Sequence, residues 1–356
     1  MSKPMSMRKY AGIALLTLAL LALPIVLSAA GTAWVRITNL AILYIFLSLG
    51  LNIVVGYAGL LDLGYIAFYG VGAYVYALLA SPFFGLHLPF WIILPIGAAL
   101  AALFGVLLGT PTLKLRGDYL AIVTMGFGEI VRIFLNNLSR PINITNGPQG
   151  IARIDPVSVG GIGFGHDDTF LGIAFSGPMK YYYLLLLLLL GVIAINLRLQ
   201  NSRIGRAWEA IREDETAARA IGIDTTRVKL LAFAMGACFG GVAGGMFSAI
   251  QAFISPESFA LTESVMVLSM VVLGGMGNVW GVIAGALMLS YVPELLRYTV
   301  GPMQMAVFGR TLIAPEVIRM LLFGLALVLT MRFRPAGLWP LRARRREFAA
   351  TRIEAE

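Results

Sequence analysis

Two charged residues of opposite sign, Glu129 and Arg132, stand three positions apart inside an apolar stretch. Residues at this spacing are neighbours on a helix surface, so the pattern predicts an ion pair on one helix face. An ionisable group at membrane depth is a candidate for function, whereas a pair that neutralises itself near a membrane boundary needs no function. Both interpretations stay open here, and the second is favoured.

The rest of the chain offers no set of side chains for enzymatic chemistry. Its one cysteine, Cys238, lies in an apolar run, and its two histidines, His87 and His166, are far apart in sequence. No Ser–His–Asp or Cys–His arrangement is legible, and the phosphate-binding pattern G-x-x-x-x-G-K-[ST] does not occur. We therefore expect a chain that is not an enzyme, holds no metal or cofactor and does not bind ATP through such a loop.

The composition indicates a membrane protein. Of the 356 residues, 59% are hydrophobic and 13% are charged, whereas soluble domains carry about 25% charged residues. One membrane-spanning helix needs about 20 apolar residues, so the chain has room for around ten spans and no large soluble domain. The net charge of +9 falls between and beyond the apolar runs. Positive charge placed there orients a membrane protein, and we expect no nucleic-acid partner.

The apolar runs predict an all-α fold, a polytopic bundle of about ten spans that forms one transmembrane domain over residues 1–356. The linker from Gly274 to Asn278, which includes Gly275 and Gly277, could join two full spans or break one re-entrant helix. The predicted spans are 11–30, 37–56, 65–80, 90–109, 118–138, 180–198, 228–254, 262–275, 280–296 and 312–331.

The distribution of positive charge predicts that both termini are cytoplasmic. With that orientation, 19 of the 27 Lys and Arg residues fall in cytoplasmic stretches, including the basic tail 332–356, and six fall outside. Residues 1–30 also resemble a signal peptide, with a basic start and Ser28-Ala29-Ala30 at the end. The apolar run is long for such a peptide, which favours a span. Five spans in each half would permit an inverted repeat.

Glycines are concentrated in two stretches of the chain, one between the second and third predicted spans and one within the seventh. Gly56, Gly59 and Gly64 surround Asp62, which predicts either a helix break that lines a translocation route or a tight turn with Asp62 as the N-cap of the next span. The tight turn is slightly favoured. Gly236, Gly240 and Gly244 recur every fourth residue, a spacing that favours close helix packing over a pore wall or a subunit interface.

Residues 198–229 form the long polar stretch between predicted spans. Ile204, Ala207, Trp208 and Ile211 share one helix face. Asp214 is then expected to cap a short helix from Glu215 to Ile221, with Gly222 at its C′ position and Asp224 capping the next span. From the residues alone, this pair of short helices either docks a cytoplasmic partner or rests in the lipid headgroups.

The segment from Glu215 to Gly222, sequence ETAARAIG, resembles the EAA coupling loop of ATP-binding-cassette (ABC) importer permeases. Further segments resemble the LivM-type permease subunits of branched-chain amino-acid importers and appear in that family's order over roughly residues 40–340. These segments are GYAGLLDLGY at 56–65, LRGDY at 115–119, TNGPQG at 145–150, VLGGMGN at 272–278 and FRPAGLW at 333–339.

The resemblance implies a bacterial inner-membrane permease paired with a second permease, two cytoplasmic ATPase subunits that bind the ATP, and an external substrate-binding protein. It implies that ATPase coupling rests on Glu215, Ala217, Ala218 and Gly222, with Trp208 beside them. Urea and short-amide importers are similar, so the substrate stays open. The alternative is an ATP-independent carrier or channel for small polar solutes. The Gly- and Pro-rich stretch 139–179, with Asn146-Gly147-Pro148, either receives a binding protein or merely connects two spans.

Overall fold

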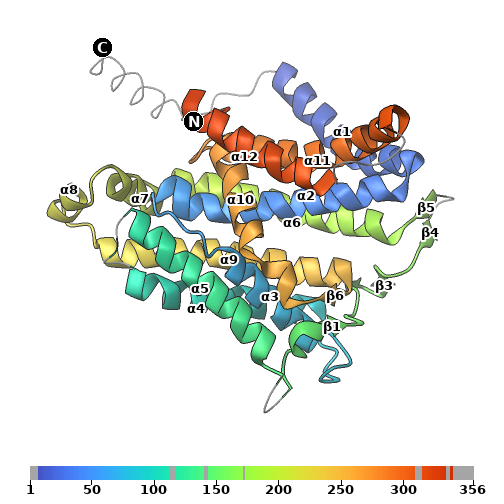
Figure 1. The fold of residues 1–356 in the computed structure, drawn as a ribbon, viewed down its shortest axis with the longest axis horizontal. Helices are drawn as coiled ribbons and strands as arrows, with labels where there is room; N and C mark the ends of the chain where they lie inside the picture. Colours follow the sequence, from blue (N-terminus) through green and yellow to red (C-terminus); the bar gives the residue numbers. More distant parts are fainter. Residues whose placement is uncertain are drawn as a thin grey trace.

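The computed structural model describes residues 7–112, 115, 117–139, 143–170, 173–308, 315–333 and 337–339, and these residues are mostly helical. The long helices run roughly along one direction, with the short α7 and α8 at one end and the strands at the other (Figure 1). The α-helices are α1 (Met7–Ala30), α2 (Thr32–Leu51), α3 (Ile66–Leu79), α4 (Phe90–Thr112), α5 (Asp118–Asn137), α6 (Gly177–Gln200), α7 (Arg203–Glu213), α8 (Glu215–Ala220), α9 (Thr225–Gln251), α10 (Leu261–Gly274), α11 (Val279–Phe308) and α12 (Pro315–Phe333).

Shorter elements interrupt these helices. A π-helix, η1 (Asn52–Tyr57), continues α2, and two 3₁₀ turns are η2 (Gly147–Gln149) and η3 (Pro256–Phe259). Three two-stranded antiparallel ribbons form at the strand end, where β1 pairs with β6, β2 with β3 and β4 with β5. The strands are β1 (Ile151–Ala152), β2 (Ser158–Val159), β3 (Ile162–Gly163), β4 (Asp168–Phe170), β5 (Ile173–Phe175) and β6 (Phe253–Ile254).

Within the described part of the chain, six helices are long and apolar enough to cross a membrane: Thr32–Tyr57, Phe90–Thr112, Gly177–Gln200, Thr225–Gln251, Pro256–Gly274 and Val279–Met305. At Gly274–Asn278, α10 and α11 are separate helices joined by a turn, and whether both cross the membrane stays a prediction. A side chain on Gly274 would meet the Gly281 backbone, and one on Gly285 would meet Met270, so the two helices pack antiparallel. The segments 1–6 and 340–356 lie outside the described residues, and with them most of the predicted basic tail.

Helix α9 lies at the centre of the bundle and packs against α2, α3 and α4. Gly236 faces Gly50 of α2, and Gly240 and Gly244 face Phe68 and Tyr69 of α3. Tyr65 is fully buried here and its Oη donates to the Gly236 carbonyl at 2.9 Å. The expectation that this glycine stripe serves helix packing is therefore confirmed.

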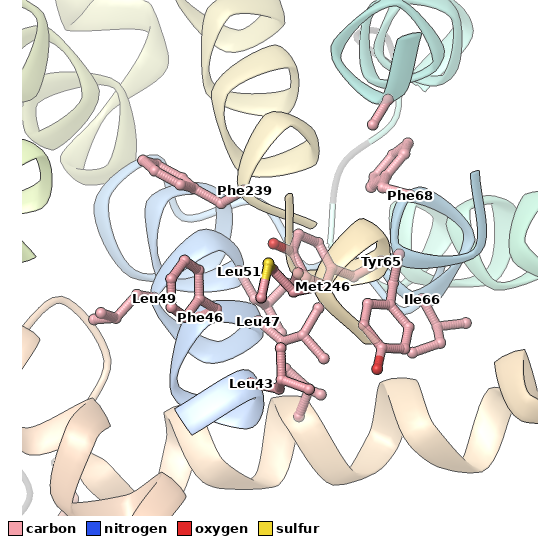
Figure 2. Packing of buried hydrophobic residues seen from close by; sticks show 14 of the residues in the cluster. Leu43, Phe46, Leu47, Leu49, Leu51, Tyr65, Ile66, Phe68, Phe239 and Met246 are labelled. Carbon is pink, nitrogen blue, oxygen red and sulfur yellow. The ribbon is translucent and has the colours of Figure 1, made fainter. Parts of the chain in front are cut away.

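The apolar core continues along α2, whose side chains fill the space between α9 and α10. Leu43, Phe46 and Leu47 belong to the same buried apolar cluster as Met246 of α9 (Figure 2). Tyr65 and Phe68 approach the same region from the start of α3, with their rings 6.0 Å apart edge to face. This core fixes the relative positions of α2, α3 and α9, which carry the site described below.

We predict that Gly244→Ala lowers the thermal unfolding midpoint of the purified protein. Its new methyl group would collide with the Tyr69 carbonyl and the Ala73 amide of α3, and such overpacking costs about 1–3 kcal/mol. The matched control is Gly191→Ala on α6, where a methyl group meets no atom within 4 Å. The control should leave the midpoint unchanged or raise it, since alanine is the better helix former. Equal midpoints for the two variants would contradict the close α3–α9 packing.

Candidate functional site

The 198–229 loop folds as two short helices, α7 and α8. Ser202 caps α7 by accepting a hydrogen bond from the Gly205 amide at 3.0 Å. Trp208 and Ile211 form its buried face, and Trp208 Nε1 donates to the Val228 carbonyl of α9 at 2.7 Å. Ala207 is half-buried while Ile204 is 37% exposed. The predicted apolar face is therefore confirmed for its central residues, and it packs against the protein.

Helix α8 begins at the predicted Glu215 and ends at Ala220, one residue before the predicted end. Asp214 Oδ1 accepts hydrogen bonds from the Thr216 and Ala217 amides at 2.7 and 3.0 Å. Gly222 follows the helix with a φ of +90°, and Asp224 caps α9 through the Arg227 amide at 3.1 Å. Within this short helix Ala218 is buried and Ala217 is exposed. Ile221 is 75% exposed, which leaves an apolar side chain at the tip of the loop.

Glu215 ties this tip to the bundle. Its Oε2 lies 2.7 Å from Lys229 Nζ on α9, and its Oε1 lies 3.2 Å from Arg219 Nη2. The Lys229 side chain is only 6% exposed, so the pair is shielded from solvent. Removing one partner would leave a buried charge without compensation. The Glu215 carboxylate therefore holds the orientation of α8 relative to α9.

Helix α7 rests directly on residues 52–65, called here the helix break. Arg212 Nη1 donates to the Gly56 carbonyl at 2.6 Å. Gly59, with φ +69°, lies against the aliphatic part of the Arg212 side chain, where a Cβ would collide. The rings of Tyr57 and Trp208 lie nearly parallel with centroids 6.4 Å apart. A displacement of α7 would therefore act on the break.

The helix break also meets the turn between α10 and α11. Asn52 Oδ1 accepts a hydrogen bond from the Gly277 amide at 2.8 Å. A side chain on Gly56 would collide with both groups. The two glycine-rich segments that the sequence singled out, near Gly56 and near Gly274–Gly277, thus lie against each other. Here α2 ends in the π-helix η1 and a non-helical stretch leads to α3, and whether this stretch lines a translocation route stays a prediction.

Residues 337–339, at the end of the described chain, close this turn from the other side. Gly337 packs against Gly275, which leaves no room for a side chain. The Leu338 amide donates to the Leu273 carbonyl at 2.9 Å, and the Trp339 amide donates to the Gly274 carbonyl at 3.1 Å. Residues 337–339 therefore form a backbone clamp on the α10–α11 turn, a role that their sequence did not indicate.

Asp62 does not have the predicted capping role. Helix α3 begins at Ile66, with Tyr65 at the N-cap position. Asp62 Oδ1 instead accepts from the Gly64 amide at 2.9 Å, two residues along the chain. The side chain is 1% exposed, and Gly64 lies against the Thr124 carbonyl of α5. The N-cap prediction is wrong because the chain must pass close to α5 before α3 can start.

A cavity of about 210 Å³ lies where these parts meet. Its wall includes residues 58–61 of the helix break, the start of α5 at Gly117 and Asp118, and the charged side chains Arg212, Glu215 and Lys229. The cavity therefore lies beside the direct contacts between α7 and the break, toward the start of α5. This space gives α7 and α8 room to shift relative to α5.

Glu129 and Arg132 lie apart from this loop, near the middle of α5. Arg132 Nε donates to both Glu129 carboxylate oxygens at 3.1 and 3.0 Å, and Nη2 donates to Oε1 at 2.5 Å. The predicted ion pair on one helix face is confirmed. The side chains are 29% and 43% exposed for Arg132 and Glu129, so the pair lies on the outside of the described bundle.

At the strand end, sequence reasoning missed two polar anchors. His87 Nδ1 lies 2.5 Å from Asp155 Oδ2, and the Lys180 ammonium bonds Asp168 Oδ2 at 2.6 Å. Asn146 has a φ of +60° and donates through Nδ2 to the Gly150 carbonyl at 2.8 Å. The described residues contain no group of three or more His, Cys, Asp or Glu that could hold a metal ion. Residues that pair although they are far apart in the sequence, such as His87 and Asp155, form no short-range sequence pattern from which the pair could be predicted.

Comparison with known proteins identifies the family. The family model for the branched-chain amino acid transport system permease component matches residues 33–331. The chain belongs to this family. It is 46% identical over 320 residues to the high-affinity branched-chain amino acid transport system permease protein LivM of Escherichia coli, covering 86% of this chain and 70% of the relative.

More distant relatives of two kinds also match. A probable branched-chain amino acid transport permease protein LivM of Methanocaldococcus jannaschii is 27% identical, over 84% of this chain and 90% of the relative. The permease protein LivH of Escherichia coli is 23% identical, over 71% of this chain and 81% of the relative. No solved structure matches the chain significantly. Three of the sequence segments that resembled this permease family, ETAARAIG, GYAGLLDLGY and VLGGMGN, lie in the loop, the break and the α10–α11 turn.

We predict that Gly222→Val loosens α8. A side chain at Gly222 would meet no atom within 4 Å, so the positive φ is the sole source of strain, and it costs about 1–2 kcal/mol for a residue with a Cβ. Hydrogen exchange of the α8 amides should then be faster by a factor of roughly 5–30. Gly222→Asn is the control, because asparagine tolerates positive φ best among residues with a Cβ. Identical exchange in both variants would contradict a required positive φ.

We predict that Asp62→Ala destabilises the protein while Asp62→Asn does not. Asparagine keeps the Oδ1 that accepts from the Gly64 amide, whereas alanine leaves that buried amide without a partner. Such a loss costs about 1–3 kcal/mol. The thermal unfolding midpoints of the two variants in detergent provide the measurement. A drop for Asp62→Asn equal to that for Asp62→Ala would mean that the charge itself is required.

Proposed function

We propose that this chain is the membrane-spanning permease subunit of an ABC importer that moves branched-chain or related amino acids into the cell. Two relatives that cover most of the chain are named as permeases of branched-chain amino acid transport. The family match over residues 33–331 supports the same function. The subunit carries no cofactor of its own and is not an enzyme, and ATP is bound by separate polypeptides.

The observation that carries the coupling part of the proposal is the contact between α7 and the helix break. The loop tip at α8 is exposed, whereas Trp208 and Arg212 on α7 hold the break through a ring contact and a hydrogen bond to Gly56. The break in turn holds the α10–α11 turn through Asn52 and Gly277. A push on the loop by an ATPase would therefore move α2, α3, α10 and α11 together.

Such a push shifts the protein between two states only if the ATPase subunits bind those states unequally. The α8 tip suits this requirement because Ala217 and Ile221 are exposed and offer an apolar contact, while Glu215 keeps the helix attached to α9 through Lys229. Among the residues implied in coupling, Ala217 would touch the ATPase, and the exposed Ile221 beside it would add to this contact. The conformation of the tip would be maintained by Ala218, Gly222 and Trp208.

We place the chain in the bacterial inner membrane as one transmembrane domain with ten crossings and both termini in the cytoplasm. Besides the six long apolar helices, α1, α3, α5 and α12 would supply the remaining crossings. The concentration of Lys and Arg near the α7–α8 end supports this orientation, since positive loops stay inside. The strand end, with its three ribbons, then faces outward.

The partners we propose are a second permease, two ATPases and an external substrate-binding protein. The chain is similar to both LivM and LivH of Escherichia coli, two permeases named for the same transport system. This pairing supports a heterodimer of related subunits. The ribbons at the strand end, which include residues 151–175, would receive the binding protein.

An ATP-independent carrier is less well supported. Proton-coupled carriers bury an unpaired carboxylate, yet Glu129 is bonded to Arg132, and Glu263 accepts from Tyr44 Oη at 3.0 Å. Both carboxylates therefore have partners within the chain.

The test is uptake of radiolabelled leucine into proteoliposomes that hold this chain with its neighbouring permease and ATPases. Binding protein is added outside and ATP is present or absent inside. We expect uptake that needs both, and we expect Gly222→Val to reduce leucine-stimulated ATP hydrolysis while Gly222→Asn retains it. Uptake that ignores ATP and follows an ion gradient would overturn the proposal in favour of the carrier.

A further inference from the structure

Helix α5 segregates polar and apolar residues more strongly than the other long helices. Its buried side, which includes Thr124, Gly128 and Val131, packs against α3, α4 and η3. Successive residues of an α-helix are rotated by about 100° around its axis. On this basis the polar residues of α5 fall within a sector of roughly 60° on one flank, and they are Asp118, Glu129, Arg132 and Asn136. We call these four residues, with Ile122 and Met125 between them, the α5 polar flank.

The other exposed side of α5 is apolar. Ile130, Ile133 and Phe134 are 65%, 47% and 57% exposed and suit contact with lipid chains. The polar flank does not suit lipid, because hydrocarbon offers no partners to polar groups. The two flanks of the same helix therefore face different surroundings.

The ion pair at the centre of the polar flank has unused bonding capacity. Arg132 carries five N–H donors, and its bonds to Glu129 use Nε and one hydrogen of Nη2. The remaining donors have no partner within the described part of the chain. Glu129 is 43% exposed and keeps lone pairs free for another donor. A positive group with free donors and a negative group with free acceptors thus stand side by side.

A third charge lies at the same end of α5. Glu257, on η3, is exposed and acts electrostatically on Arg132. Helix α5 and η3 are in contact, so the end of the polar flank is held against the α9–α10 connection. The local charge is then net negative by one, which favours water and a cationic group over hydrocarbon.

We propose that the α5 polar flank lines the translocation pathway and that Glu129 and Arg132 bind the α-ammonium and α-carboxylate groups of the amino acid in transit. This inference rests on the proposed function. The free Arg132 donors match a carboxylate, and the exposed Glu129 oxygens accept from an ammonium group. Met125, one turn before Glu129, and Ile122 provide an apolar surface for an aliphatic side chain.

The existing bond between Glu129 and Arg132 suits transport rather than tight binding. A zwitterion must compete with the bidentate contact that the pair already makes, which lowers its affinity. A pathway site must bind strongly enough for entry and weakly enough for release.

The first arm of the test measures uptake in the complete complex, with this chain, its neighbouring permease, both ATPases and the binding protein. Glu129→Gln and Arg132→Gln should each reduce ATP-driven leucine uptake at least about tenfold, since hydrogen bonds to charged groups contribute at that level. The complex should still assemble, and it should still hydrolyse ATP when the loaded binding protein is added. The matched control is Glu294→Gln with Arg297→Gln, which removes the i,i+3 pair of α11 without touching α5 and should leave uptake unchanged.

The second arm tests whether water reaches the flank. In a Cys238→Ala background, Met125→Cys should react with a membrane-impermeant thiol reagent, and leucine with ATP and binding protein should slow the reaction. Ile130→Cys, on the apolar side of the same helix, is the matched control and should not react. Equal labelling of the two positions, or protection of neither, would overturn the pathway assignment.

The outcomes separate this inference from the proposed function. If the unaltered complex takes up no amino acid, the proposed function fails and this inference fails with it. If the unaltered complex transports leucine and the Glu129 and Arg132 variants match it, only this inference is overturned. Loss of the second permease from the purified variants would also overturn it, because the flank would then be a subunit contact.

Discussion

The structure depends on how its broken helices satisfy their backbone groups. A helix that breaks inside an apolar bundle exposes amides and carbonyls that neither lipid nor hydrophobic side chains can bond. At residues 52–65 the remedy comes from distant parts of the chain. Asn52 Oδ1 accepts a hydrogen bond from the Gly277 amide, and Arg212 Nη1 donates one to the Gly56 carbonyl. The break, the α7–α8 loop and the α10–α11 turn are therefore stable only as a set.

This mutual dependence links the two functional regions that we propose. The α7–α8 tip is exposed to a partner, and its anchor holds the point where α2 ends and α3 begins. Helix α3 contacts α5, which carries Glu129 and Arg132 on its polar flank. Movement at the loop therefore reaches the ion pair through packed helices and close glycine contacts such as Gly64 against Thr124. Helix α3 would then take part both in coupling to the ATPase and in substrate passage.

Sequence reasoning succeeded where the signal was local. The caps Asp214 and Asp224, the positive φ at Gly222 and the Glu129–Arg132 pair all follow from residues within four positions of each other. It failed at Asp62, where a plausible N-cap is displaced by the approach of the chain to α5. It also gave no structural role to residues 337–339, because a backbone clamp depends on geometry and not on side-chain type.

By itself, the sequence determined that this protein is a helical membrane permease with a capped loop between spans, since hydrophobic length, charge placement and capping act over short distances along the chain. Only the tertiary structure decided that Gly56 meets Gly277, that Arg212 holds the helix break and that Glu215 pairs with Lys229. Gly56 and Gly277 are far apart in sequence, and their contact is set by how α10 and α11 pack against α2. Packing of this kind leaves no periodic pattern in a single sequence.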